Sequence, residues 1–389
     1  MTILLVIIYI SFISLGLPDS LLGSAWPIMH SILNVPTEYA GILSFSVCIG
    51  TVFSSLSAMW LNRTIGTGKT ISISTMLTSF ALFGYSFSSS FLLLIPISIV
   101  LGLGAGAIDS AINNYVALKY KANHMAFLHA FWGLGATLGP LILSIGLSNN
   151  NYRLGYRIIA SIQLFLSIVQ FLFIKKFDKE ENKKTIVVDG KEVKNIIVGI
   201  SREWTKYLAM LAFFFYCSIE TSMLIWISTY SVNFLKFNIA DGARITSLFF
   251  IGITSGRLIS GLITKKIDTV SLIYISAIIS SVFSFFLLLN INRYFSIFCI
   301  LVIGLGFAPL FPSMIHRTPR RFGSILSPKI IGLQMASAYI GSAFFPPLIG
   351  VIMINYGYQF LPILVLFFSL FIIIVTIKIE KKKAGLIKK

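Results

Sequence analysis

The chain has 389 residues, of which 56% are hydrophobic and 11% are charged, with a formal net charge of +18 and a mean hydropathy of +0.90. Soluble globular domains contain roughly 25% charged residues, so this composition excludes an ordinary soluble protein. Because the Lys and Arg residues gather in short connections between apolar runs, the positive charge indicates orientation in a membrane rather than binding of nucleic acid.

Apolar segments of roughly 20 residues recur along the whole chain, and each is long enough to cross a bilayer as a helix. The fold class that they predict is an all-α integral membrane protein. The first segment resembles a signal peptide in length, but it lacks a positive start and a clear cleavage site, so we expect it to remain as the first span. The twelve expected helices are 3–28, 38–60, 70–88, 91–118, 127–148, 154–175, 207–235, 241–264, 270–290, 294–315, 326–352 and 357–378.

A long polar segment divides these helices into two sets of six. It predicts an N-terminal bundle at 1–175, a linker at 176–206, a C-terminal bundle at 207–378 and a basic tail at 379–389. Most Lys and Arg residues lie in the linker, in the tail and in the connections on their side of the membrane. By the positive-inside rule, both termini and the linker are expected in the cytoplasm, with the protein in the plasma (inner) membrane. The opposite side holds Arg153, Arg157, Lys236, Arg244 and Arg293.

Three carboxyl groups lie deep inside expected helices, namely Asp19, Asp109 and Glu220. A charge at the centre of a membrane helix costs roughly 2.5–3.5 kcal/mol, and such residues usually face a cavity or a partner. These acids are therefore expected to face the bundle interior, to be protonated part of the time, or both. A carboxyl group with these properties is a candidate for proton coupling, although it could also hold Na⁺ or only hydrogen-bond a neighbouring helix.

The neighbours of the acids support such a role. Gly102, Gly106, Asp109 and Asn113 share one helix face, where the glycines allow a second helix to approach and Asn113 places an amide one turn beyond the acid. In the first helix, Pro18 comes directly before Asp19 and weakens the helix locally.

An internal repeat relates the two sets of helices. The sequence GLG at 102–104 recurs at 304–306, and HAFWGLGATLGPLI at 129–142 is similar to QMASAYIGSAFFPPLI at 334–349. Two parallel repeats of six helices predict a pseudo-twofold axis along the membrane normal, with a binding site between the halves near the midplane.

These features resemble the major facilitator superfamily over essentially the whole chain. GRLISGLITKK at 256–266 is similar to its loop signature, and LNRTIGTGKT at 61–70 resembles the same signature without its usual Asp. The resemblance implies the major facilitator fold and places Arg63 and Arg257 in gating loops.

A narrower resemblance is to the fucose–galactose–glucose:proton symporter branch, through LGLPDSLLGSAWP at 15–27 and AGAIDSAINNYV at 105–116. Bacterial fucose permeases have Glu at the place of Asp109, Pro at the place of Asn114, and a Gln that helps to hold sugar at the place of His129.

A sugar site needs polar groups for hydroxyls and flat aromatic faces for the ring. His129 could also pass a proton, because its ordinary pKa lies near 6.5. Aromatic residues are also common at membrane interfaces without any ligand. The candidate substrate-binding residues are Asn113, Asn114, His129, Gln334, Trp26, Trp132, Tyr216 and Trp226.

The leading hypothesis is therefore uptake of a sugar or similar small polyhydroxy solute together with a proton, by alternating access. A proton-coupled multidrug efflux antiporter of the same superfamily is the alternative. An intramembrane aspartyl protease would need Tyr-Asp and Gly-x-Gly-Asp patterns, whereas these acids follow Pro18 and Ile108. We expect no enzyme activity, no cofactor or metal site, no nucleic-acid partner, and a monomer in the lipid bilayer.

Overall fold

The computed structural model describes residues 3–119, 122–174, 204–263, 266–322 and 327–387. Twelve stretches of the described chain are long and apolar enough to cross a membrane, which confirms the predicted number of spans. The elements are α1 (Ile3–Asp19), α2 (Leu21–Ile32), the 3₁₀ turn η1 (Thr37–Tyr39), α3 (Ala40–Ile65), α4 (Thr67–Phe87), α5 (Phe91–Lys119), α6 (Ala122–Leu147), α7 (Tyr152–Leu172), α10 (Thr205–Asn233), α11 (Ile239–Ile263), α12 (Thr269–Leu289), α13 (Arg293–Phe307), α14 (Leu310–Phe322), α15 (Ser327–Tyr356) and α16 (Phe360–Ile387).

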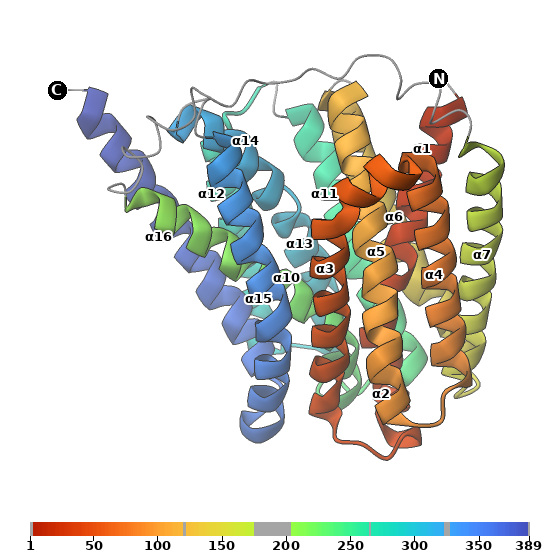
Figure 1. The fold of residues 1–389 in the computed structure, drawn as a ribbon. Helices are drawn as coiled ribbons and strands as arrows, with labels where there is room; N and C mark the ends of the chain where they lie inside the picture. The colour runs from red at the N-terminus through yellow and green to blue at the C-terminus, as the bar shows by residue number, and fades with distance from the viewer. Residues whose placement is uncertain (1–2, 120–121, 175–203, 264–265, 323–326, 388–389) are drawn as a thin grey trace.

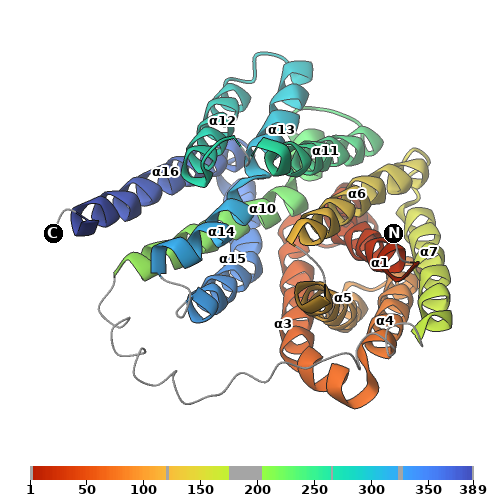
Figure 2. The ribbon, with the colours of Figure 1, turned by 90° about the horizontal axis from the view of Figure 1, so that it is seen from above.

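The helices form two halves, with α1–α7 in one and α10–α16 in the other (Figure 2). Within the first half the extensive helix pairs are α1 with α6, α3 with α5, α4 with α5, and α4 with α7. The second half repeats this pattern as α10 with α15, α11 with α13, α12 with α13, and α12 with α16. The same pairing in both halves is what two parallel repeats produce, so the packing agrees with the internal repeat of the sequence.

The halves meet through three helix pairs that obey the same symmetry, namely α6 with α11, α3 with α15, and α2 with α10. Glycines make the close approaches, because a Cβ at Gly23 would meet the backbone of Leu224 and Ile225, and one at Gly41 would meet Pro347. The ribbons of the two halves separate toward the edge where α1 begins and α16 ends (Figure 1). At the opposite edge the two halves lie close together (Figure 1).

The first span differs from its prediction, because α1 ends at Asp19 and α2 starts at Leu21. Pro18 has no N–H to donate to the carbonyl of Ser14, one turn earlier. The side-chain amide of Gln163 on α7 donates to that carbonyl instead, and the Ser14 hydroxyl donates to Gln163 Oε1 over 2.5 Å. The break thus brings α7 against α1 and leaves Asp19 at the end of a helix.

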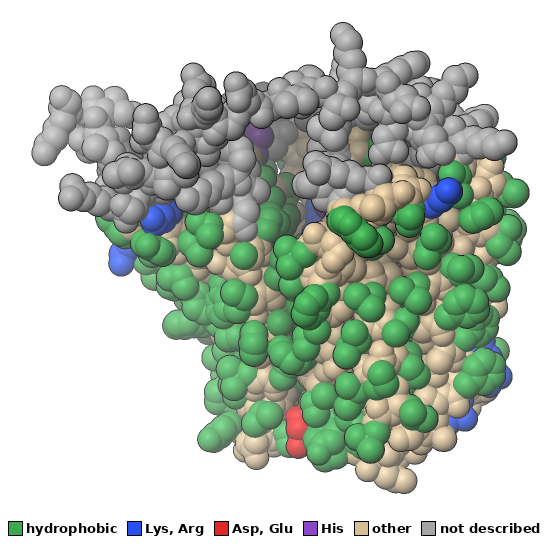
Figure 3. Space-filling model, in the orientation of Figure 1, with side chains coloured by type: hydrophobic (Ala, Val, Ile, Leu, Met, Phe, Trp, Pro, Cys, Tyr) green, Lys and Arg blue, Asp and Glu red, His purple; other side chains and the backbone are tan. Residues whose placement is uncertain are grey.

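Other boundaries differ by a few residues. The fifth span, Phe127–Leu147, begins where it was predicted, within a helix α6 that starts earlier, at Ala122. The last helix, α16, continues to Ile387 through the segment predicted as a basic tail. The predicted linker 176–206 lies almost entirely outside the described residues. Hydrophobic side chains dominate the visible surface of the bundle (Figure 3), and residues such as Leu92 and Leu262 are 73% and 74% exposed, as expected for a surface that faces lipid.

Candidate functional site

The three predicted acids lie on helices that face the junction between the halves. Asp19 and Glu220 are near the middle of the spans Leu4–Ile32 and Thr205–Asn233, and Asp109 is on α5. All three keep partial exposure, although most of their helix neighbours are buried. Their side chains are therefore not fully enclosed by the helices around them.

Asp19 is held by an aromatic side chain. The indole Nε1–H of Trp132 on α6 donates to Asp19 Oδ2 over 2.7 Å. Asp19 also lies within electrostatic range of Asp109. The break after Asp19 positions this bond, because the hydroxyl of Ser20 donates to the carbonyl of Ala136 on the same α6 helix.

Asp109 has an amide partner on its own helix, as its spacing predicted. Asn113 Nδ2 donates to Asp109 Oδ1 over 2.8 Å and to the Asp109 carbonyl over 3.0 Å. Tyr339 on α15, in the opposite half, is within electrostatic range of Asp109. Among the described residues, neither Asp109 nor Asp19 forms an ion pair, and the donors that hold them are neutral.

Glu220 has a different environment, because it pairs with a cation. Arg257 Nη2 lies 3.3 Å from Glu220 Oε1, and the hydroxyl of Tyr216 donates to the same oxygen over 2.9 Å. The Glu220 and Arg257 side chains are 19% and 13% exposed. Tyr216 can also donate to the carbonyl of Phe307, at 3.3 Å. These contacts of Tyr216, Glu220 and Arg257 connect α10, α11 and α13.

One ring links the acids of the two halves. The guanidinium of Arg257 lies 5.0 Å from the centre of the Trp132 ring, and Phe250 meets the same ring edge-on at 6.0 Å. Trp132 thus contacts Asp19 through its N–H and Arg257 through its face. The result is a continuous chain of contacts from Asp19, in the first half, to Glu220, in the second.

His129 lies one turn before Trp132, with its ring edge-on to Phe12 at 5.8 Å. It is partly exposed and within electrostatic range of Arg257. The structure therefore brings together, around the three acids, the predicted residues Asn113, His129, Trp132 and Tyr216.

Other predicted binding residues lie elsewhere. Trp26 is 0% exposed and donates its N–H to the Thr37 carbonyl, while Trp226 is 1% exposed and donates to Pro346. Gln334 is 1% exposed and accepts from Thr318. In this arrangement the two indole N–H groups and the Gln334 side-chain oxygen bond to other protein groups, and all three side chains are buried away from the acids.

Two further predicted residues, Arg63 on α3 and Asn114 on α5, have side chains that lie outside the described part of the structure. The prediction for Arg257 needs correction. The family resemblance placed it in a gating loop, although the expected helix 241–264 already contained it. In the structure α11 continues to Ile263, so Arg257 lies more than a turn inside the helix. An Arg within an apolar run was the signal that could have identified it, since buried charges in membranes usually find partners.

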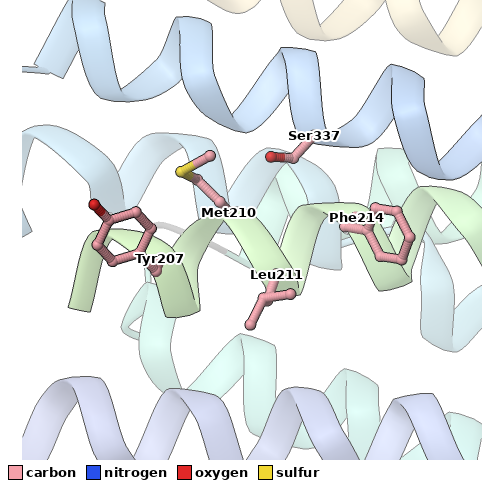
Figure 4. Close-up of a pocket in the computed structure, with 5 residues that line it drawn as sticks. All are labelled: Tyr207, Met210, Leu211, Phe214 and Ser337. Atoms are coloured by element: carbon pink, nitrogen blue, oxygen red, sulfur yellow. The ribbon is translucent and has the colours of Figure 1, made fainter. Parts of the chain in front are cut away.

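A separate pocket of about 290 Å³ lies between α10 and α15, lined by Tyr207, Met210, Leu211, Phe214 and Ser337 (Figure 4). None of the predicted site residues lines it, and its only polar side-chain groups are two hydroxyls. It offers no carboxylate or cation that would bind a polar solute, and it is separate from the cluster around the three acids.

Paired six-helix halves with a polar cluster at their junction define a membrane transporter rather than an enzyme. The sequence model of the Major Facilitator Superfamily matches residues 8–327, and the chain belongs to that family.

Among known proteins, the chain is 24% identical over 357 residues to the glucose/mannose transporter GlcP of Bacillus subtilis, covering 88% of this chain and 86% of that protein. The crystal structure of a D-xylose–proton symporter superposes with a TM-score of 0.72 at 12% identity, covering 95% of this chain and 96% of the other. That of a point mutant of the nucleoside transporter NupG gives 0.75 at 13% identity, covering 96% and 98%.

Proposed function

We propose that this protein takes up a sugar or similar small polyhydroxy solute together with a proton, by alternating access of the site between its halves. The similarity to a glucose/mannose transporter supports the substrate class. The similarity to the fold of a D-xylose–proton symporter is compatible with the mechanism. Because the substrate would bridge the two halves, its release would accompany their separation.

The observation that carries the proposal is that only one of the three acids has a charged partner. Glu220 is neutralised by Arg257, whereas Asp19 and Asp109 are held by the neutral donors Trp132 and Asn113. Two carboxyl groups that lie within electrostatic range of each other, in a site of low polarity, favour binding of a proton over a second negative charge. Asp109 and Asp19 are therefore the proposed proton carriers, and Glu220 helps to orient Arg257.

The surrounding side chains suit a hydroxylated ligand. Glu220, Asn113 and His129 offer polar groups, and Trp132 and Tyr216 offer aromatic surface close to them. A drug exporter would instead need a wide apolar pocket at this place. We also propose that both termini face the cytoplasm, that the membrane is the plasma membrane and that the monomer is sufficient for transport. H⁺ is the proposed coupling ion, and no further cofactor is required.

Proteoliposomes test the proposal directly. Radiolabelled glucose, mannose and xylose are offered with and without an inward proton gradient, and both accumulation and exchange at equal pH are measured. We expect gradient-driven accumulation of at least one sugar by the wild type. Asp109→Asn removes the exchangeable proton, so accumulation is expected to disappear while exchange continues.

The matched control is Asp241→Asn, since Asp241 is an exposed acid that pairs with Arg244 in the first turn of α11, 16 residues before Arg257. It should accumulate sugar like the wild type. Equal accumulation with and without the gradient, or normal accumulation by Asp109→Asn, would contradict the proposal. Expulsion of a dye from the vesicles would instead support the exporter.

A further inference from the structure

Trp132 is in contact with charged groups from both halves of the protein, which its sequence position alone does not reveal. Its indole N–H donates to Asp19 on α1, and its ring face lies under the guanidinium of Arg257 on α11. Arg257 in turn pairs with Glu220 on α10. One aromatic side chain thus lies between a carboxyl group without an ion-pair partner and an ion pair of the opposite half.

The geometry of this contact is fixed from two directions. Phe250, Thr254 and Arg257 follow one another at helical spacing on the face of α11 that meets α6. Phe250 touches the edge of the Trp132 ring, and Gly133 packs so closely on Thr254 that there is no room for a Cβ. The absence of a side chain at Gly133 therefore lets α6 approach the Thr254 side chain of α11 closely, next to the place where the ring meets Arg257.

The two interactions of the ring depend on each other. A cation is attracted to an aromatic face by the negative charge of its π system. When the N–H of an indole donates to an ionised carboxylate, the bond polarises the ring and makes that face more negative. Protonation of the carboxyl group weakens the bond and thereby the attraction for the cation.

We propose that Trp132 is a positioning residue that couples the proton on Asp19 to the contact between the halves. This inference rests on the proposed function. With Asp19 ionised, Trp132 holds Arg257 and the halves stay together at this level. With Asp19 protonated, the hold on Arg257 weakens and the halves separate more easily. The step moves one proton onto the carboxyl group and breaks no covalent bond.

Other titratable groups surround this relay and act on it. Asp109 on α5 is within electrostatic range of Asp19, and His129 on α6 is within range of Arg257. On α10, Glu220 pairs with Arg257, and the Tyr216 hydroxyl donates to the same Glu220 oxygen. A change in pH therefore acts on several groups, and the test must separate the effect of the Trp132 ring from the effects of these groups.

Two variants each weaken one link. Trp132→Phe keeps an aromatic face but removes the N–H, while Arg257→Lys keeps the charge beside Glu220 but loses the planar group over the ring. Each is expected to reduce proton-driven sugar accumulation on the order of tenfold, the loss that corresponds to one charge-assisted hydrogen bond or cation–π contact. Exchange at equal pH is measured alongside, and the relay predicts that accumulation falls more than exchange, because exchange requires no net proton movement.

The double variant is decisive, because both changes break the same relay. If the coupling passes through the ring, Trp132→Phe with Arg257→Lys loses no more accumulation than the worse single variant. In Trp132→Phe, the profile of exchange against pH should also move toward higher pH, since the lost N–H favoured the ionised carboxylate. If Trp132 only packed against its neighbours, Trp132→Phe would leave the pH profile of exchange unchanged, and the losses of the two single variants would multiply in the double variant.

The matched control is Trp60→Phe on α3, where the native side chain is 65% exposed on the lipid-facing surface. It should behave like the wild type in every assay. Multiplying losses in the double variant, an unchanged pH profile in Trp132→Phe, or equal loss of exchange and accumulation would each overturn the relay. Failure of the wild type itself to accumulate sugar would instead overturn the proposed function, so the two failures are distinguishable.

Discussion

The ion pair between Glu220 and Arg257 makes the sharpest prediction about stability. Its N–O distance is 3.3 Å, and the two side chains are 19% and 13% exposed. At an effective dielectric constant near 20, charges about 4 Å apart attract by about 4 kcal/mol. Removing one partner of a buried pair leaves the other charge uncompensated, at a cost of about 3–5 kcal/mol.

The cost of Glu220→Gln in free energy of unfolding should lie at the lower end of this range, at about 3 kcal/mol, because the amide oxygen can still accept from Tyr216. Arg257→Gln should cost about the same or more, since it leaves the Glu220 carboxylate without its cation. In the double variant Glu220→Gln with Arg257→Gln no charge is left unpaired. It should therefore be more stable than either single variant, although its transport stays impaired.

The assay is the free energy of unfolding of the purified variants in mixed detergent micelles, followed by far-UV circular dichroism. A double-mutant cycle gives the interaction energy, which should be at least about 2 kcal/mol for residues in direct contact. Losses that simply add in the double variant would refute the reasoning, because they would mean that the two charges do not compensate each other.

Three further predictions concern neighbouring contacts. Gln163→Leu leaves the Ser14 hydroxyl and carbonyl unpaired in a buried position, so the free energy of unfolding should fall by about 1–3 kcal/mol. Transport in cells should be preserved. An unchanged free energy of unfolding would contradict the role given to Gln163 at the Pro18 break. Gly133→Leu has no space against Thr254, so sugar uptake should be lost at normal amounts of protein in the membrane, and normal uptake would mean that α6 and α11 need not pack this closely. Asn113→Leu removes the donor to Asp109, so the pH optimum of uptake should move upward, and an unmoved optimum would show that this hydrogen bond does not tune the acid.

Much of the fold follows from local sequence. The length and polarity of the apolar runs suffice to count twelve spans, because a membrane helix satisfies its own backbone within one segment. The i, i+4 relation of Asp109 and Asn113 also predicted a contact that the structure contains. The effect of Pro18 was expected as a local weakening, and the structure turns it into a break between α1 and α2.

The rest of the site depends on contacts between helices far apart in the chain. Glu220 and Arg257 are joined across two helices, and Trp132 meets Asp19 from a helix more than 100 residues away. Such partners are set by the packing of α1, α6, α10 and α11, which one sequence does not specify. For the same reason, Trp26 and Trp226 were predicted to bind substrate, although their indoles are used in packing in this structure.

The measurement that tests the central claim most directly is proton movement during sugar entry. Wild-type proteoliposomes in weakly buffered medium are given a sugar that they transport, and the external pH is followed with an electrode in the absence of any imposed gradient. The account predicts that the external medium becomes more alkaline as sugar enters, and that this signal disappears in Asp109→Asn. Sugar entry without a change in external pH, or with acidification of the medium, would contradict it.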